Sequence, residues 1–261
     1  MNPSDKTVII TGASAGIGAA TARVFAAAGA NVVLAARDAT KLEALARGLA
    51  GRALVIPTDV ADRAAVAALV EQTVAAFGGV DIVINNAGVG LAAPVADLSL
   101  EDFQRALSVD LFGPLALTQA ALPHMRRRGR GQLIYISSVV GLRALPYLGG
   151  YAAAKAALDR LTESLRVELR GSGISVTLVR PGTTSTGFAR HRLGGGSERR
   201  RAQARAANPE RVAQAILRAA IREPRVAYVS WADWLRVLSG LLLPRVTDWV
   251  LGRAFGWAAS E

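Results

Sequence analysis

Short runs of apolar, often β-branched residues alternate along this chain with longer stretches rich in alanine. Uniformly apolar strands separated by helices are typical of a parallel sheet that helices cover on both faces. The pattern predicts an α/β fold with a doubly wound sheet, in which ligands bind at the carboxyl ends of the strands. The expected strands are 7–11, 31–35, 53–57, 80–85, 132–137, 174–180 and 225–230, and the expected helices are 16–29, 38–50, 62–77, a region up to 128, 150–170 and 209–222.

The length and composition fit one large domain. The chain has 261 residues, of which 51% are hydrophobic, and this is enough to bury a substantial core. The hydrophobic content excludes a disordered chain, and glycines without a three-residue period exclude a collagen-like one. We expect one domain over 1–230, with a lid at about 187–208 and a helical extension at 231–261.

Several kinds of chemistry are excluded by residues that the chain lacks. It has no cysteine, which rules out disulfides, cysteine nucleophiles and thiolate metal sites, and its two histidines, His124 and His191, leave little for a multi-histidine metal site. No metal site is predicted. The first ten residues lack the basic start and apolar run of a secretory signal, which favours a cytoplasmic protein.

The net charge of +11 is concentrated in the expected lid and the helix after it. Arginine binds phosphates and carboxylates well, so an anionic group on the substrate is one interpretation, and a solvated loop in an arginine-rich protein is the simpler one. Nucleic acid is not predicted as a partner, because no binding motif or aromatic platform accompanies the charge. The lid arginines are Arg190, Arg192, Arg199, Arg200, Arg201 and Arg205.

A glycine-rich turn follows the first expected strand directly. It reads Thr11-Gly12-Ala13-Ser14-Ala15-Gly16-Ile17-Gly18, and a helical pattern starts at once. Glycines permit a tight turn, and the start of a helix attracts phosphate groups. The spacing is GxxxGxG instead of GxGxxG, and a turn that serves only packing is the alternative. A strand before and a helix after it favour a pyrophosphate site made by Gly12, Ser14, Gly16, Ile17 and Gly18.

The ends of the second and third strands indicate which nucleotide binds. A carboxylate after the second strand would hold a ribose 2′-hydroxyl, whereas an arginine would pair with a 2′-phosphate. Here Ala36 is followed by Arg37, which favours NADP over NAD, with a merely solvated arginine as the alternative. After the third strand, Asp59 and Val60 are expected at the adenine edge, although Asp59 is equally suited to capping the next helix.

Tyr151 and Lys155 stand four residues apart in a helical stretch, so both point to one face. A nearby ammonium lowers the pKa of a tyrosine and makes its hydroxyl a usable general acid or base. Ser138, at the end of a strand, would place a hydroxyl donor at the same edge of the sheet, and a simple turn serine is the alternative. The three residues together predict proton-transfer chemistry.

These motifs together resemble the short-chain dehydrogenase/reductase family. The glycine turn, Asn85-Asn86-Ala87-Gly88, Ser138, Tyr151-x-x-x-Lys155, and Pro181-Gly182 followed by Thr186 occur in the family's order and spacing across about residues 6–230. The resemblance implies a single Rossmann-like domain with a seven-stranded parallel sheet.

The resemblance also implies a role for each matched residue. Tyr151 would exchange a proton with the substrate oxygen, Ser138 would hydrogen-bond that oxygen, and Lys155 would lower the tyrosine pKa and bind the nicotinamide ribose. Such enzymes manage the proton while the cofactor carries the hydride. The further residues implied along the cofactor are Asn86, Ala87 and Gly88, with Pro181, Gly182 and Thr186 at the nicotinamide carboxamide.

One position departs from the family pattern. A fourth catalytic residue is usually an asparagine in a V-N-x-x-G context, and this chain reads Val109-Asp110-Leu111-Phe112-Gly113. In the family that residue holds a water of a proton relay through its backbone carbonyl, which Asp110 also has. Its carboxylate is further suited to stabilising Lys155 in the charged form. We therefore expect activity with a modified pH profile, a purely structural Asp110 being the alternative.

The last 31 residues have an apolar stripe at helical spacing, in two segments separated at Pro244. We expect this stripe to pack on the protein or on a sister subunit, with peripheral membrane contact through 231–257 as an alternative. Charged residues interrupt any run long enough to span a bilayer. The stripe consists of Trp231, Trp234, Leu235, Leu238, Leu241, Leu242, Val246, Trp249, Val250 and Trp257.

The predicted function is an NADP(H)-dependent oxidoreductase that interconverts a carbonyl and a secondary alcohol, acting as a reductase on an apolar or lipid-like small molecule. A non-catalytic NADP-binding scaffold or sensor is the alternative, since fold does not determine function. The family resemblance implies a homodimer or homotetramer formed through the helices near 106–128 and 150–170.

Overall fold

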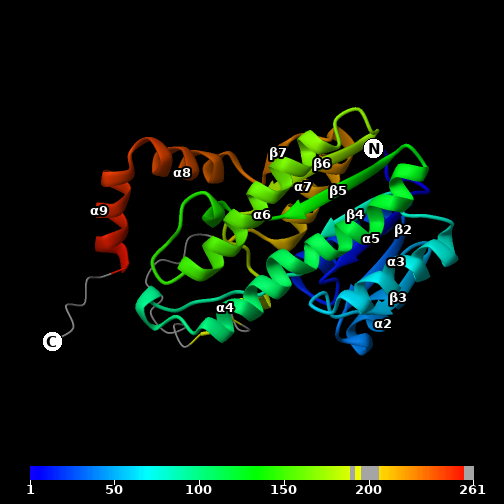
Figure 1. Ribbon diagram of the computed structural model, residues 1–261, viewed down its shortest axis with the longest axis horizontal. Coiled ribbons are helices and arrows are strands. Elements are labelled where there is room, and N and C mark those ends of the chain that lie inside the picture. Colours follow the sequence, from blue (N-terminus) through cyan, green and yellow to red (C-terminus); the bar gives the residue numbers. More distant parts are fainter. Residues whose placement is uncertain (189–191, 195–205, 256–261) are drawn as a thin grey trace.

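The computed structural model describes residues 1–188, 192–194 and 206–255. Its strands form one parallel sheet in the order β3-β2-β1-β4-β5-β6-β7, which confirms the predicted fold class (Figure 1). The strands are β1 (Thr7–Thr11), β2 (Asn31–Ala36), β3 (Ala53–Pro57), β4 (Ile82–Asn85), β5 (Gly131–Ile136), β6 (Ile174–Arg180) and β7 (Val226–Tyr228).

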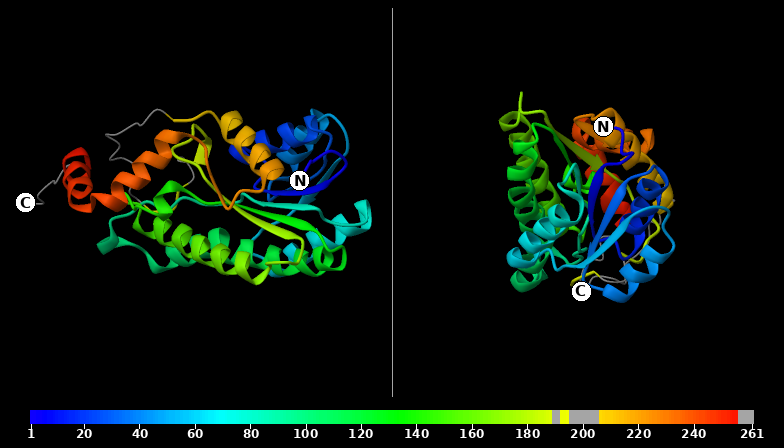
Figure 2. Two further views of the ribbon diagram at one scale, coloured as in Figure 1. Left: turned by 90° about the horizontal axis from the view of Figure 1, so that it is seen from above. Right: turned by 90° about the vertical axis from the view of Figure 1, so that its right-hand side faces the viewer.

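Helices cover both faces of this sheet, as the right-hand view of Figure 2 shows. On one face α1 (Gly16–Ala27), α2 (Ala39–Arg47) and α7 (Pro209–Arg222) pack around Phe25, and on the other α3 (Arg63–Phe77), α5 (Gly113–Arg127) and α6 (Gly149–Glu168) pack around Leu117. The remaining described elements are α4 (Leu100–Leu107), α8 (Trp231–Leu242), α9 (Pro244–Phe255), the 3₁₀ turns η1 (Val95–Asp97) and η3 (Val139–Gly141), and the π-helical turn η2 (Ser108–Phe112).

The strands are mostly apolar because they contribute to both layers. In β1, Val8 and Ile10 belong to the core on the α1 side, whereas Ile9 belongs to the core on the α5 side. All three side chains are fully buried. Successive side chains of a strand point to opposite faces, so a strand buried on both faces has no solvent-facing positions for polar residues.

Side-chain caps determine where several helices begin. Asp38 accepts a hydrogen bond from the backbone of Lys41 at 3.0 Å at the start of α2, and Asp62 accepts from Ala64 at 2.8 Å at the start of α3. Asp62, and not Asp59, therefore caps the helix after the third strand. Such caps satisfy N–H groups that have no partner in the first turn of a helix.

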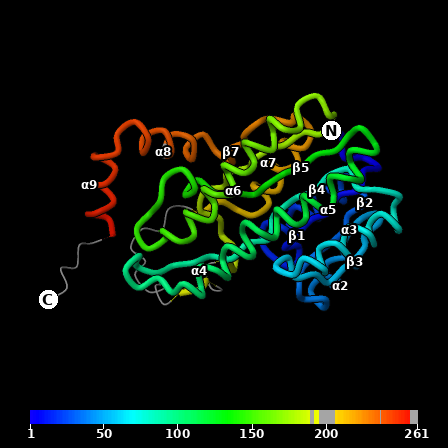
Figure 3. The backbone as a smooth tube through the Cα atoms, viewed as in Figure 1, coloured from blue at the N-terminus to red at the C-terminus, as the bar shows by residue number. Residues whose placement is uncertain are grey.

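Between β4 and β5, the elements α4, η2 and α5 follow one another as a single helical rod that contains a π turn. The chain passes from α4 through the π turn η2 into α5 without leaving the helix (Figure 3). Pi turns are rare and occur mostly at functional sites. This one carries Asp110 on its inner side, where the side chain is completely buried.

The two C-terminal helices lie beyond the carboxyl edge of the sheet, at the end of the molecule away from the N-terminus (Figure 1). Within the described part of the chain, no helix combines the length and apolar character needed to cross a bilayer.

Candidate active site

The glycine turn after β1 is built so closely that side chains would not fit. Gly12 has a φ of +66°, a left-handed conformation that glycine adopts readily. A Cβ atom on Gly18 would lie 2.2 Å from the carbonyl oxygen of Gly12. The turn therefore leaves the start of α1 open for close approach by a ligand, as a phosphate site requires.

Asn86 and Ala87 lie directly beside this turn. The Asn86 side-chain amide donates to the carbonyl oxygen of Thr11 at 2.8 Å, and the backbone N–H groups of Asn86 and Ala87 both donate to the Thr11 hydroxyl at 3.0 Å. Thr11 was not predicted as a site residue. Its position between the apolar run of β1 and Gly12 was the available signal, because a buried polar side chain there requires partners.

The segment after β6 closes the other side of the turn. A Cβ atom on Gly16 would lie 3.1 Å from the Thr186 methyl carbon, so Thr186 sits directly over the glycine turn. Farther along, the rings of Phe188 and Tyr151 have centroids 5.8 Å apart. The structure thus brings the glycine turn, Asn86–Gly88 and Thr186 to one edge of the sheet.

Tyr151, Lys155 and Ser138 meet at the same edge. The Lys155 ammonium donates to the carbonyl oxygen of Ile136, at the end of β5, at 3.2 Å. It also lies 5.8 Å from the centroid of the Tyr151 ring. Ser138 forms a side-chain hydrogen bond with Tyr151, and its hydroxyl accepts from the backbone of Val140 at 3.3 Å.

Asp110 forms a buried ion pair with Lys155. Its Oδ1 lies 2.8 Å from the Lys155 Nζ, and its Oδ2 accepts from the backbone of Val89 at 3.2 Å. The carboxylate also abuts Gly88, where a Cβ atom would come within 2.8 Å of it. Where the family usually has a neutral asparagine, this chain thus places a carboxylate in contact with the Lys155 ammonium.

Burial dominates the electrostatics of this cluster. Burial raises the pKa of Tyr151 above its ordinary value, even though Lys155 and the hydrogen bond from Ser138 lower it, and Asp110 raises it further. Lys155 thus acts on the pKa of this tyrosine in the expected direction, but burial outweighs it and the net shift is upward.

The surroundings of Lys155 favour its charged form. Burial disfavours the ammonium, but Asp110, Tyr151 and Asp159 together raise its pKa above the ordinary value. Burial likewise raises the pKa of the Asp110 carboxyl, and Lys155 opposes that shift. A buried carboxylate and a buried ammonium in contact each supply the partner that the other needs.

The residues expected at the adenosine end lie apart from this cluster. Arg37 is exposed at the end of β2, while the neighbouring Asp38 caps α2 and forms an ion pair with Lys41 at 2.6 Å. Asp59 accepts a hydrogen bond from Ala61 at 3.0 Å, and Val60 is buried against Gly113. Ser14 is partly buried and Ile17 packs against the core.

The C-terminal extension contributes to the site through an unexpected residue. Asp233 of α8 is buried against Gly182, where a Cβ atom would lie 2.2 Å from its carboxylate. Its Oδ2 accepts from the Ser230 hydroxyl at 2.7 Å. The buried side of α8 is therefore formed by Asp233, Val237 and Gly240, at helical spacing.

The predicted apolar stripe lies largely on the other side of α8 and along α9. Trp231 is 75% exposed and Trp249 is 58% exposed. The extension is nevertheless tied to the domain, because Asp248 forms an ion pair with Arg143 and the rings of Phe255 and Tyr147 have centroids 6.4 Å apart. Trp257 lies outside the described residues.

The described part of the expected lid is attached to the body by backbone pairing. Leu193 donates to the carbonyl oxygen of Gly90 at 2.8 Å and accepts from Ala92 at 3.0 Å, which places Arg192 next to Gly90. Arg192 is near enough to Tyr151 to lower the pKa of its hydroxyl. The other lid arginines, Arg190, Arg199, Arg200, Arg201 and Arg205, lie outside the described residues.

Comparison with known proteins gives a consistent result. Residues 6–193 match the sequence profile of the short chain dehydrogenase family. The Dehydrogenase/reductase SDR family member 7B of Rattus norvegicus is 38% identical over 191 residues, which are 70% of this chain. The match spans 59% of the length of that relative.

Solved structures agree with this match. A short chain dehydrogenase/reductase of Burkholderia phymatum in complex with NAD has a TM-score of 0.82 and 28% identity, with all of both chains covered. An alcohol dehydrogenase of the archaeon Thermococcus sibiricus complexed with 5-hydroxy-NADP has a TM-score of 0.75 and 29% identity, covering 86% of this chain and 95% of its own. These neighbours bind nicotinamide dinucleotides of both kinds.

Proposed function

The chain belongs to the short-chain dehydrogenase/reductase family, and from this premise we propose that it is an NADP(H)-dependent oxidoreductase that interconverts a carbonyl and a secondary alcohol. The observation that carries the proposal is the buried cluster at the carboxyl edge of the sheet. There Lys155 forms an ion pair with Asp110 and a hydrogen bond to the Ile136 carbonyl oxygen, and it lies beside the ring of Tyr151. Tyr151 in turn forms a hydrogen bond with Ser138.

The residues of this cluster manage the proton. Tyr151 donates a proton to the carbonyl oxygen during reduction and accepts it back during oxidation, while the Ser138 hydroxyl donates a hydrogen bond to the same oxygen. The bound cofactor supplies or takes up the hydride. Burial raises the pKa of Tyr151, so its phenol is available as the proton donor that reduction requires.

Lys155 and Asp110 maintain the charge balance around Tyr151. The Lys155 ammonium stabilises the phenolate that forms when Tyr151 gives up its proton. Asp110 holds that ammonium in its charged form and fixes its position against β5. The carboxylate therefore has a function that the asparagine usual in the family cannot supply, since a neutral amide does not balance a charge.

The adenosine and pyrophosphate portions of a dinucleotide fit the glycine turn. Gly12, Gly16 and Gly18 would hold the pyrophosphate at the start of α1, where side chains are excluded by the surrounding atoms. Arg37 would pair with a 2′-phosphate. The carboxylate nearest to the end of β2, on Asp38, caps α2 and pairs with Lys41, which supports NADP over NAD.

The remaining cofactor contacts follow from the same placement. Asp59 and Val60 would lie toward the adenine, although Asp59 also stabilises its own turn. Asn86, Ala87 and Gly88 would lie along the cofactor between the glycine turn and Lys155. Pro181, Gly182 and Thr186 would contact the nicotinamide carboxamide.

The substrate is proposed to be apolar or lipid-like. Phe188 packs against Tyr151 and supplies an apolar wall next to the reacting oxygen. Arg192 lies at the rim of the same space, so an anionic group on the substrate remains the second possibility for this end of the site.

The proposal is tested by binding before turnover. NADPH should bind more tightly than NADH in titrations followed by nicotinamide fluorescence, and small aromatic ketones such as 4-nitroacetophenone should then be reduced. Tyr151→Phe should reduce turnover by about 10²–10⁴-fold with NADPH binding retained. Tyr135→Phe is the matched control, because its hydroxyl bonds to Thr118 in the core, and its turnover should stay within about twofold of the unmodified protein.

The outcomes separate three interpretations. NADPH binding with turnover that survives Tyr151→Phe would overturn the assigned proton donor. Binding without turnover of any carbonyl would favour a cofactor-binding scaffold. Preference for NADH would overturn the role of Arg37 alone.

Assembly and location also belong to the proposal. A homodimer or homotetramer through α5 and α6 and a cytoplasmic location are expected, and light scattering of the purified protein measures the first. A monomeric mass would refute that assembly.

A further inference from the structure

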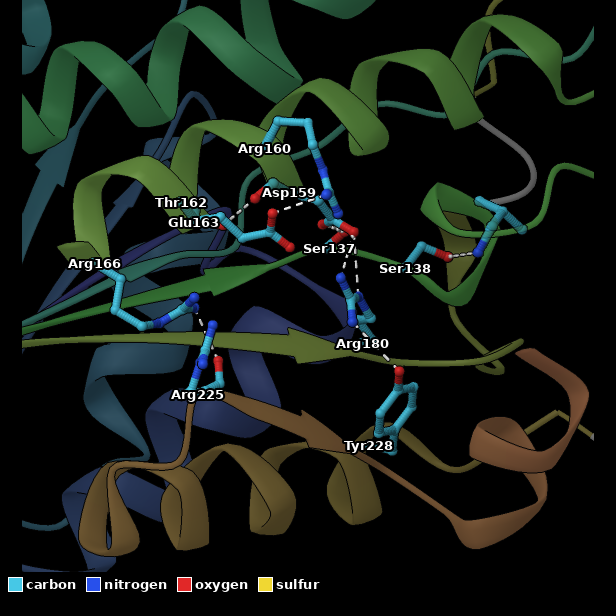
Figure 4. A network of polar contacts seen from close by, with 11 residues as sticks. Ser137, Ser138, Asp159, Arg160, Thr162, Glu163, Arg166, Arg180, Arg225 and Tyr228 are labelled. Atoms are coloured by element: carbon cyan, nitrogen blue, oxygen red, sulfur yellow. Dashed lines mark hydrogen bonds and ion pairs between the residues drawn. The ribbon is translucent and has the colours of Figure 1, made fainter. Parts of the chain in front are cut away.

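A second buried ion pair lies behind the candidate active site. Arg180 donates to the Asp159 Oδ2 through Nη2 at 2.8 Å and through Nε at 3.2 Å, and the Ser137 hydroxyl donates to the Asp159 Oδ1 at 2.6 Å. The exposed fractions of these three residues are 0% for Asp159, 5% for Arg180 and 4% for Ser137. Figure 4 shows Asp159 between the other two, with Tyr228 beyond Arg180.

Each member of this cluster adjoins a segment of the candidate site. Ser137 immediately precedes Ser138 at the end of β5, and Arg180 immediately precedes Pro181 at the end of β6. Asp159 follows Lys155 by one helical turn on α6, on the same side as Tyr151. One carboxylate therefore connects the serine, the tyrosine–lysine helix and the Pro181–Gly182 loop.

Backbone hydrogen bonds reinforce two of these connections. Ser137 donates to Val179 at 2.8 Å, and Val139 donates to Pro181 at 3.1 Å, so the serine segment and the loop after β6 run side by side. The helix that carries Tyr151 and Lys155 joins this frame through Asp159. A change at Asp159 would therefore loosen α6 against the serine segment and the loop together, while the Lys155 hydrogen bond to the Ile136 carbonyl oxygen would still join α6 to β5.

The energetics do not favour such a cluster as a simple stabiliser. Removing a carboxylate and a guanidinium from water is costly, and well-packed apolar residues often replace buried ion pairs without loss of stability. Arg180, by contrast, donates through both Nε and Nη2 to one oxygen of Asp159, and two charge-assisted hydrogen bonds from a planar guanidinium fix orientation as well as distance. A buried charged pair at the junction of three site segments is thus suited to fixing the positions of these segments relative to one another.

We propose that Asp159, Arg180 and Ser137 are positioning residues that hold the Ser138 hydroxyl and the Pro181–Gly182 loop in register with Tyr151 and Lys155. This inference rests on the proposed function, because the segments that it joins are those assigned to the proton and the cofactor. The same carboxylate also acts on the charge of Lys155. That ammonium faces Asp110 from η2, and Tyr151 and Asp159 from its own helix, and Asp159 raises its pKa.

The first test uses kinetics. Asp159→Asn keeps the shape of the side chain and removes its charge, while Ser137→Ala removes one hydrogen bond and leaves the ion pair intact. Asp159→Asn should lower kcat for 4-nitroacetophenone reduction by about 100-fold, since displacements of about 1 Å at a reacting centre have effects of this size. Ser137→Ala should lower kcat by about tenfold, and NADPH affinity should change by less than about threefold in both.

The matched control is a surface ion pair of the same helix. Arg160 and Glu163 are 2.8 Å apart with side chains 64% and 40% exposed, and Figure 4 shows them beside Asp159. Glu163→Gln should change kcat and affinity by less than about twofold, because exposed pairs contribute little. If Asp159→Asn fails to fold, Ser137→Ala against Glu163→Gln decides the question.

The second test needs neither substrate nor cofactor. The chain has three lysines, Lys6, Lys41 and Lys155, so the ¹³Cε resonance of Lys155 in labelled protein can be assigned by its loss in Lys155→Arg. Asp159→Asn should move the titration of this resonance to lower pH, because the carboxylate is lost and Arg180 is left unpaired. Glu163→Gln should leave the titration unchanged.

These readouts distinguish failure of the inference from failure of the proposed function. Kinetics and a lysine titration that match Glu163→Gln in both variants would overturn the inference, with the proposed function intact. A wild-type protein that neither binds NADPH nor reduces the ketone would overturn the proposed function. The lysine titration then decides alone whether Asp159 acts on Lys155.

Discussion

Gly18 provides a direct test of how the nucleotide turn is built. Gly18 lies in the first turn of α1, where alanine is favoured over glycine by about 1 kcal/mol on helix propensity alone. The packing predicts the opposite sign, because a Cβ atom there would lie 2.2 Å from the Gly12 carbonyl oxygen and 2.6 Å from the Asn86 side-chain nitrogen. Gly18→Ala therefore separates local propensity from tertiary fit.

The size of the effect follows from what must move. Contacts near 3.5 Å are normal for carbon, so the backbone or Asn86 has to shift by roughly 1 Å. The first obstacle is backbone, and Asn86 is held to Thr11 by a 2.8 Å hydrogen bond. Overpacking costs about 1–3 kcal/mol and a lost hydrogen bond about 1 kcal/mol, so a net loss of about 2 kcal/mol remains after the gain in propensity. For a domain of this size that corresponds to a fall in Tm of roughly 4–8 °C.

The assay combines thermal unfolding with cofactor titration. Gly18→Ala should lower Tm and weaken NADPH binding by at least about tenfold, because the displaced turn no longer fits the pyrophosphate. Gly48→Ala is the matched control, since Gly48 ends α2 and a Cβ atom there would meet only the Leu45 carbonyl oxygen, at an ordinary 3.5 Å. If Gly18→Ala raises Tm and binds NADPH like Gly48→Ala, the steric reasoning about this turn is refuted.

Other predictions concern the charges and the exposed extension. Arg37→Leu should weaken NADPH binding by at least about tenfold and leave NADH binding unchanged in fluorescence titrations, whereas equal losses for both would contradict a 2′-phosphate contact. Asp110→Asn should lower the pH at which alcohol oxidation is half-maximal, because Asp110 raises the pKa of Tyr151. An unchanged pH–rate profile would show that this carboxylate does not affect the pKa of the tyrosine. In liposome flotation, a Trp231→Ser, Trp249→Ser double variant should behave like the full-length protein. The reason is that the apolar stripe carries few charges of either sign and is expected to face protein. Stronger flotation of the unmodified chain would assign the stripe to a membrane.

The strands and the identity of the candidate site were predictable from local pattern. The ranges expected for β1, β3 and β6 coincide with the observed strands, since a strand buried on both faces leaves an uninterrupted apolar run. The glycine turn and the tyrosine–lysine pair were visible because their members are close together in the chain. Burial was not visible, so the sequence indicated that Lys155 lowers the pKa of Tyr151 but not that burial outweighs this effect.

Contacts between distant segments explain what else was missed. Asp159 and Arg180 stand on different elements, and neither has a neighbour in the sequence that indicates a partner. In α8 the spacing correctly indicated an amphipathic helix, but the side that packs consists of Asp233, Val237 and Gly240, with few large apolar residues. A small residue and a buried acid form a close-fitting surface only against a segment of matching shape. The local sequence of α8 does not show which segment that is.

The π turn at Ser108–Phe112 restricts how this part of the chain can vary in length. Such a turn holds one residue more than an α-helical turn, and each residue of an α-helix advances by about 100° around the axis. Deleting one residue of this turn would restore regular winding and leave α4 and α5 in register, but it would remove the wide turn that carries Asp110 to Lys155. Deleting a residue near the start of α5 would instead rotate the rest of that helix by about 100° and take Leu117 out of the core. In a one-residue deletion scan across 100–127, folded protein should therefore survive deletions inside the π turn better than deletions inside α4 or α5.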